Sequence, residues 1–180
     1  MSVKRVTSDV VVGQSVELRP YRKEDESDFV GLFQDAEVAR FVGDGLQSEE
    51  EDRALFQRIF SHVYAAGSFA VWAVVAGEAV IGHAELKPSP RDDVPGWELV
   101  YVIRRSHWRR GYGREVARLI AHFAFDRLGL SAVFATVDTE NVGSLRLLTG
   151  IGFVQTNHPR DGDRVAIFMQ PATAAPSAAQ

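Results

Sequence analysis

The sequence predicts a single α/β (α+β) domain built on a mixed, mostly antiparallel twisted sheet flanked by helices. Three strand-like runs follow one another in the middle of the chain, at 69–75, 79–86 and 97–103. Short connections of this kind favour antiparallel pairing. A strand–helix–strand unit then spans 97–137, which favours one parallel crossover. The length of 180 residues, with 46% hydrophobic and 24% charged residues, fits one globular domain.

The first half of the chain supplies a strand and two helices before the middle strands. Residues 16–19 alternate in polarity and predict a strand. Apolar residues at helical spacing predict a helix over 24–33. A second helix is expected to start at Ser48, which forms a capping-box pattern with Glu51, and to end at Gly67.

The second half alternates strands and helices. Gly77, in a short polar turn, predicts a hairpin between the first two middle strands. A long amphipathic helix is expected over 114–128, with Gly129 as its C-cap. The remaining expected elements are a buried strand at 132–137, a short helix at 141–149, and strands at 153–156 and 164–169.

Composition argues against several classes of function. The chain has no cysteine, which excludes disulfides, thiolate metal sites and cysteine nucleophiles. A net charge of -4 disfavours nucleic-acid binding, and no apolar run is long enough to span a bilayer. The five histidines show no metal-ligand spacing. We expect a cytoplasmic protein with no metal, nucleic-acid or membrane partner, and a domain over 15–170 between a flexible tail (1–14) and a disordered Ala/Pro/Ser-rich tail (171–180).

The joint between the strand at 97–103 and the long helix has the features of an anion site. Residues 104–114 contain five arginines together with Gly111 and Gly113. Glycines let a backbone approach a ligand closely, and a helix start offers free N–H groups and partial positive charge. A Rossmann loop would need a third glycine where Val116 stands, and no Walker sequence is present. A tight joint with a solvated basic face is the alternative interpretation.

The order of these pieces resembles the GNAT superfamily of N-acetyltransferases over roughly residues 15 to 170. Trp108-Arg109-Arg110-Gly111-Tyr112-Gly113 resembles motif A of that family, which usually has Gln or Arg where Trp108 stands. The tryptophan is similar to the RimJ/RimL-like branch, the ribosomal-protein-alanine N-acetyltransferases. The runs at 16–20 and 98–103 look like the first and fourth strands of that branch, and those at 141–144 and 150–153 look like motif B.

The resemblance implies a GNAT-like fold and acetyl-CoA as cosubstrate. In the family the fourth and fifth strands, here 97–103 and 132–137, splay apart to form the CoA cleft. The amides of 109–114 would hold the pyrophosphate, and the backbone of 102–104 would pair with the pantetheine arm. The Val102 amide would also stabilise the oxyanion. The implied cofactor-binding set is Val102, Ile103, Arg104, Trp108, Arg109, Arg110, Gly111, Tyr112, Gly113, Arg114 and Asn141.

Two residues are candidates for the catalytic step. Glu98 stands where related acetyltransferases often carry a glutamate base, and Glu85 is a rival on the neighbouring strand. A solvent-facing edge glutamate or an ion-pair partner is the alternative role for Glu98. Leu148 occupies the place of the usual tyrosine acid, so Ser144, on the same helix face as Asn141, is the candidate proton donor. Alternatively, Ser144 bonds its own helix backbone.

The acceptor stays open. Direct attack by a primary amine is implied, either a protein N-terminus or a small molecule. An antibiotic or small-amine detoxifying acetyltransferase is one alternative, and a non-catalytic CoA-binding module is another. Similar proteins are often dimers, so a homodimer is possible.

Overall fold

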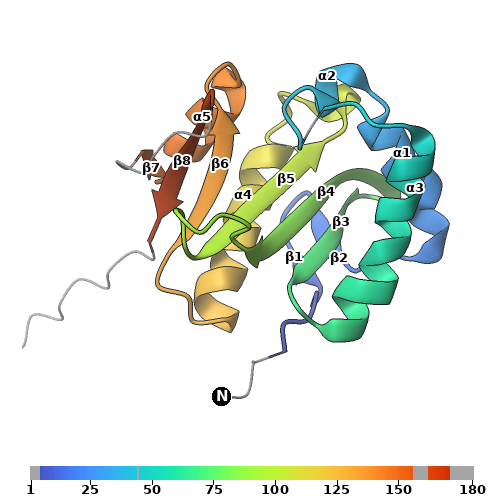
Figure 1. Ribbon diagram of the computed structural model, residues 1–180, viewed down its shortest axis with the longest axis horizontal. Helices are drawn as coiled ribbons and strands as arrows, with labels where there is room; N and C mark the ends of the chain where they lie inside the picture. The colour runs from blue at the N-terminus through green and yellow to red at the C-terminus, as the bar shows by residue number, and fades with distance from the viewer. Residues whose placement is uncertain (1–4, 44, 156–161, 171–180) are drawn as a thin grey trace, which may run out of the picture.

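The computed structural model describes residues 5–43, 45–155 and 162–170 and is built on one eight-stranded sheet (Figure 1). The strand order is β1-β2-β3-β4-β5-β6-β8-β7. Every neighbouring pair is antiparallel except β5 and β6. The predicted mixed sheet with one parallel pair is therefore confirmed. The strands are β1 (Val11–Val12), β2 (Glu17–Arg19), β3 (Ala70–Ala76), β4 (Ala79–Pro88), β5 (Trp97–Ile103), β6 (Val133–Asp138), β7 (Val154–Gln155) and β8 (Arg164–Met169).

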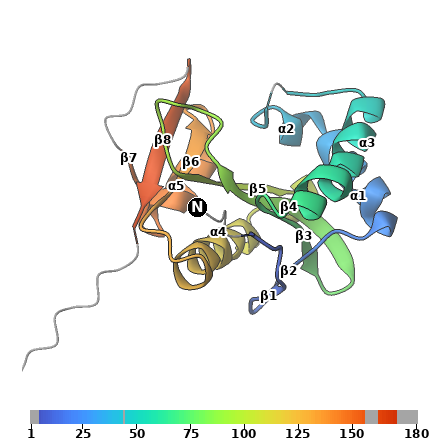
Figure 2. The same cartoon turned by 60° about the horizontal axis from the view of Figure 1, so that its bottom comes forward.

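Helices cover both faces of the sheet, as Figure 2 shows for α1 and α3 on one side and α4 on the other. Each side has its own apolar core. Val71, Ala73 and Val102 pack on the α1/α3 side, whereas Leu99 and Ile103 pack on the α4 side with Leu148 of α5. The helices are α1 (Glu26–Phe33), α2 (Ala36–Ala39), α3 (Glu49–Arg58), α4 (Tyr112–His122) and α5 (Val142–Thr149).

The parallel strands β5 and β6 separate soon after they meet. Both strands are fully described, yet their only register pair is Glu98 with Phe134. Beyond Glu98 the two strands diverge, and the start of α5 follows the far end of β6 (Figure 1). The sheet thus contains a split that opens towards the carboxyl ends of β5 and β6. The splayed strands implied by the family resemblance are present.

The N-terminal segment differs from the expected flexible tail over 1–14. Val6 is buried, the Ser8 hydroxyl accepts a hydrogen bond from Val71 N at 2.9 Å, and β1 pairs with β2. A short segment can be held this firmly when its backbone groups find partners on a sheet edge. Residues 1–4 and the tail expected at 171–180 lie outside the described residues.

The helices follow their sequence signals, with shifted ends. The capping box of Ser48 and Glu51 is confirmed, with Ser48 N donating to Glu51 Oε2 at 2.9 Å. Helix α3 continues as a π-helical stretch over Ile59–Tyr64, and α4 does the same over Phe123–Arg127. Helix α4 starts two residues before the expected Arg114, because Gly111 serves as its N-cap.

Candidate active site

The loop before α4 is shaped by two residues in the left-handed region. Gly111, the N-cap of α4, has φ +85°. Arg109 has φ +60° and is the only non-glycine with positive φ among the described residues. Successive backbone N–H groups around such residues form a concave nest that suits an anion. The first amides of α4 add donors that have no partner within the helix. The residues present therefore fit a pyrophosphate.

The arginines of this loop divide into two groups. Arg104 is engaged by α1, since its guanidinium donates to Asp28 Oδ1 at 3.1 Å. Along the described stretch of chain, no ion pair is recorded for Arg105, Arg109, Arg110 or Arg114. The guanidinium of Arg114 lies beside Gly150 at the end of α5. Arg105, Arg109 and Arg110 are the arginines of the loop left to pair with a phosphate, for which arginine forks are well matched.

The arginines of the loop affect the pKa of His107, which lies within the same loop. The pKa of His107 is lowered from its usual value by partial burial and then by the charges of Arg110 and Arg104. The contribution of Arg110 and Arg104 reflects the positive charge that the loop carries. Such a charge attracts an anionic ligand.

Two replacements of Arg109 separate what its backbone conformation and its charge each contribute to acetyl-CoA binding. We expect Arg109→Gly to keep most of the affinity for acetyl-CoA, because glycine accepts φ +60° without strain. Arg109→Ala removes the same charge but retains the strained backbone, which costs about 1 kcal/mol. Calorimetric titration of both variants measures the difference. Equal, large losses of affinity would mean that the side chain, not the nest, holds the anion.

The hydrogen bonds of β5 show which backbone groups face the split. Arg104 N donates to Ile81 O at 2.7 Å, so this amide points towards β4. Backbone direction alternates along a strand, which orients Val102 towards β4 as well and Tyr101 and Ile103 towards the split. The expected pairing of Val102 and Arg104 with the pantetheine arm therefore conflicts with the sheet's own hydrogen bonds. Within this stretch, Tyr101 and Ile103 are the residues whose backbone groups face the split.

Trp108 closes the loop back onto the end of β5. Its indole Nε1 donates to Ile103 O at 2.6 Å, and the residue is 42% exposed. This bond agrees with an Ile103 carbonyl that faces away from β4. The Gln or Arg usual at this place in the family also carries side-chain N–H donors. In this chain the tryptophan links the loop to the end of β5.

The start of α5 carries Asn141 and Ser144 to the split. Asn141 Oδ1 accepts from Ser144 N at 3.1 Å and caps the helix, which leaves its NH2 group able to donate elsewhere. The Ser144 hydroxyl lies 3.0 Å from the hydroxyl of Tyr101 on β5. This partner replaces the helix-backbone bond considered as an alternative. Leu148 is 1% exposed and packs in the core.

Sequence reasoning missed Tyr101, which lies against the glycine-rich loop. A Cβ added to Gly113 would sit 3.3 Å from the Tyr101 ring and 3.1 Å from Leu147 Cδ1. Gly113 thus lets α4 approach both β5 and α5. The signal in the sequence was weak, because Tyr101 is one of several apolar residues in a strand and its partner Ser144 is 43 positions away.

Glu98 lies on the opposite face of β5 from Tyr101. It alternates with Leu99 and shares the α1/α3 side of the sheet with Val102. Its side chain is largely buried, and in the register it is opposite Lys87 of β4. Glu98 therefore sits where β5 and β6 are still paired, at the base of the split.

The rival Glu85 is committed to a buried network on the same face. His83 Nε2 donates to Glu85 Oε1 at 3.0 Å, and Lys87 Nζ lies 2.6 Å from Glu85 Oε2. Burial opposes ionisation of Glu85, but the His83 hydrogen bond and the Lys87 charge outweigh it and lower its pKa to about 2. A carboxylate with so low a pKa is a poor proton acceptor. Glu98 is therefore the better candidate base.

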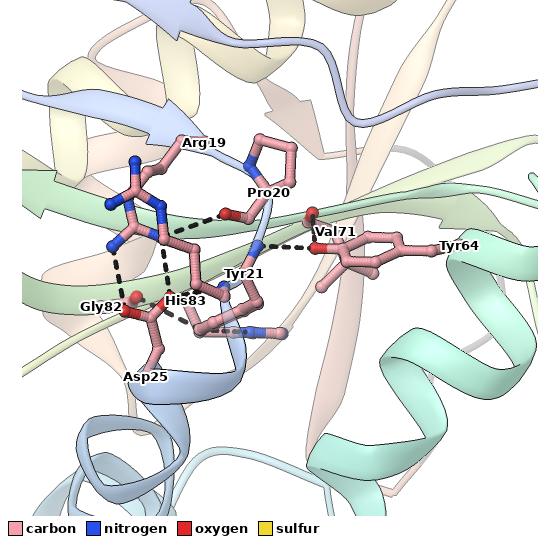
Figure 3. A network of polar contacts seen from close by, with 9 residues as sticks. Arg19, Pro20, Tyr21, Asp25, Tyr64, Val71, Gly82 and His83 are labelled. Carbon is pink, nitrogen blue, oxygen red and sulfur yellow. Dashed lines mark hydrogen bonds and ion pairs between the residues drawn. The ribbon is translucent and has the colours of Figure 1, made fainter.

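Figure 3 shows how this network continues into the start of the domain. His83 Nδ1 lies 3.0 Å from the hydroxyl of Tyr21, and Tyr21 N donates to the Tyr64 hydroxyl at 2.8 Å. Nearby, the guanidinium of Arg19 binds both carboxylate oxygens of Asp25, at 2.7 and 3.0 Å. These contacts fix the chain entering α1 against β3 and β4. Their role is to position that wall of the site.

Replacement of Glu85 should cost stability. The fall of its pKa from 4.5 to about 2, at about 1.4 kcal/mol per pKa unit, is worth roughly 3 kcal/mol. We expect Glu85→Gln to lose about this much at neutral pH. Because the folded pKa is lowered, the contribution is present above about pH 4.5 and disappears as pH falls towards 2. Urea unfolding from pH 7 to 3 tests this: a gap between wild type and variant that does not narrow at acid pH would contradict it.

No helix in the described ranges is long and apolar enough to cross a membrane. In those same ranges no group of three or more His, Asp or Glu side chains could hold a metal ion.

Known proteins resemble this chain in sequence and fold. A family model described as an acetyltransferase (GNAT) domain matches residues 15–154. The uncharacterized N-acetyltransferase YoaA of Bacillus subtilis is 29% identical over 142 residues, which are 76% of this chain and 77% of the relative. The FsC-acetyl coenzyme A-N(2)-transacetylase of Aspergillus fumigatus is 26% identical over 144 residues, 76% of this chain and 61% of the relative.

Solved structures share the fold at low identity. Mycobacterium smegmatis RimJ in complex with CoA-disulfide superposes with a TM-score of 0.76 at 15% identity, over 91% of this chain and 88% of that one. The family match covers well over half of the sequence, including β5, the basic loop and α5. The chain therefore belongs to the GNAT family of acetyltransferases, and it is an acetyl-CoA-dependent acyltransferase.

Proposed function

We propose that the protein transfers an acetyl group from acetyl-CoA to a primary amine by direct attack at the split between β5 and β6. The observation that carries this proposal is the placement of two candidate groups on opposite faces of β5. Glu98 is on the α1/α3 side, and Ser144 reaches Tyr101 on the α4 side. A thioester in the split would lie between a proton acceptor and a proton donor.

The basic loop supports the position of the donor. The nest at Arg109 and Gly111 would bind the pyrophosphate, and the backbone of Tyr101 and Ile103 would pair with the pantetheine arm like an added strand. Asn141 would donate to the arm from the α5 side. With the arm along β5, the oxyanion donor is a backbone amide that faces the split, in place of the Val102 amide.

The acceptor would approach from the other face, beside Glu98. Helix α2 and the residues after it form the rim at the open end of the split: Arg40 pairs with Glu140 at 2.7 Å, and Arg164 donates to Gly43 O. Trp108 supports the RimJ/RimL-like branch, so we propose a protein α-amine as the first acceptor class to test, with small amines as the second. The expected cytoplasmic location and homodimer stay predictions.

Two measurements test this function. Titration with acetyl-CoA should show binding well below about 1 mM, the upper end of usual KM values. Release of CoA thiol should then be followed with N-terminal peptides, polyamines and aminoglycosides as acceptors. Turnover on any primary amine supports the proposal, and the preferred class identifies the acceptor. Tight cofactor binding without turnover across the panel would favour the non-catalytic CoA-binding module.

A further inference from the structure

The Tyr101–Ser144 pair links the two walls of the split. Tyr101 comes from β5 and Ser144 from the first turn of α5, and their hydroxyl oxygens are 3.0 Å apart. The Tyr101 ring lies against Gly113 at the start of α4, and its hydroxyl is oriented by the contact with Ser144. The pair lines the split on the α4 side of the sheet, on the face of β5 opposite Glu98.

The chemistry of the two hydroxyls sets the direction of this bond. A phenol is far more acidic than an aliphatic alcohol, so Tyr101 is the better donor and Ser144 the better acceptor. With Tyr101 donating, the Ser144 hydrogen is free to point into the split. Burial raises the pKa of Tyr101, partly offset by the bond with Ser144, so its proton is retained near neutral pH.

We propose that Tyr101 is a positioning residue and the proton source behind Ser144, so that the two hydroxyls form a relay to the leaving sulfur. This inference rests on the function proposed above. As the carbon–sulfur bond breaks, its electron pair stays on sulfur. Ser144 gives its proton to the sulfur and forms the S–H bond, while Tyr101 gives its own proton to Ser144. The tyrosinate is then reprotonated from water, which also receives the proton that the amine lost to Glu98.

The first test removes one hydroxyl at a time. Tyr101→Phe keeps the ring against Gly113, and it should lower kcat at least about tenfold with the Kd for acetyl-CoA unchanged. Ser144→Ala should have a similar effect. The double variant should be little worse than either single one, because both changes break the same relay. Ser61→Ala is the control for loss of a hydroxyl: it also removes a hydrogen-bonded serine hydroxyl, but on the π-helical stretch after α3 and away from the split.

The second test changes the leaving group. A selenol is much more acidic than a thiol and leaves without a proton, so acetyl selenoester of CoA should largely abolish the kcat penalty of Tyr101→Phe. A structural role would give the same penalty with sulfur and selenium. Equal penalties, or a Tyr101→Phe enzyme with wild-type kcat on acetyl-CoA, would overturn the relay while leaving the acetyl transfer intact. A wild-type protein that acetylates no amine would overturn both proposals.

Discussion

Glu98→Gln is expected to lower kcat/KM for the acceptor amine about 100-fold to 1,000-fold while leaving acetyl-CoA affinity unchanged. Glutamine has the size of glutamate but cannot take the proton that the attacking amine must lose. The side chain is largely buried on the acceptor face, at the base of the split. Steady-state kinetics with saturating acetyl-CoA, together with calorimetric titration of the cofactor, separate the two effects.

Two further variants sharpen this prediction. Glu78→Gln, in the exposed β3–β4 turn, is the matched control and should behave as wild type. Glu98→Ala leaves a space in which added formate can act as the base, so formate should restore part of the lost rate. If Glu98→Gln keeps the full rate, the base lies elsewhere, and Glu98 is a packing residue beside Lys87.

Helix starts and turns were predictable where the residues that form them are neighbours in the sequence. The capping box of Ser48 and Glu51 involves neighbours in the chain, and the glycine of the β3–β4 turn has φ +61° as such turns require. The placement of Val6 and Ser8 was not predictable in this way. The Ser8 hydroxyl accepts a hydrogen bond from Val71, 63 positions later, and no local pattern of polar and apolar residues predicts a contact of that kind.

In the candidate site, too, features with a local sequence signal were predictable, and features that depend on contacts between distant residues were not. The anion loop and the serine of α5 were visible because glycines, arginines and helix starts have local signatures. The assignment of Val102 and Arg104 to the pantetheine arm depended on which way the strand's backbone groups face. That direction changes with every residue and is set by the register with β4, for which the hydrogen bond from Arg104 to Ile81 is the evidence. Likewise, only the fold brings Tyr101 to Ser144.

The same limit applies to the choice between Glu85 and Glu98. Both are glutamates on neighbouring strands, and nothing in their sequence neighbourhoods separates a base from an ion-pair partner. The structure separates them because His83 and Lys87 face Glu85 on the same strand face and lower its pKa to about 2. Tertiary neighbours decide the acidity of a carboxyl group, and they decide it residue by residue.

Gly111→Val is expected to weaken acetyl-CoA binding about 100-fold, a loss of about 2.7 kcal/mol. Gly111 has φ +85°, a conformation that a β-branched residue almost never adopts. No heavy atom lies within 4 Å of the position of an added Cβ, so the strain comes from the backbone alone. The loop would have to change conformation to relieve it, and the amides of the nest and of the first turn of α4 would no longer converge on one anion.

Gly77→Val supplies the comparison that makes the loss of affinity interpretable. Gly77 also has a left-handed backbone, φ +61°, and open space around an added Cβ, but it lies in the β3–β4 turn. Both variants should lose similar stability in urea unfolding, since both place a β-branched residue in the left-handed region. Only Gly111→Val should lose affinity for acetyl-CoA in calorimetric titration. If both bind acetyl-CoA equally well, the arginine side chains hold the pyrophosphate and the glycine serves only the turn into α4.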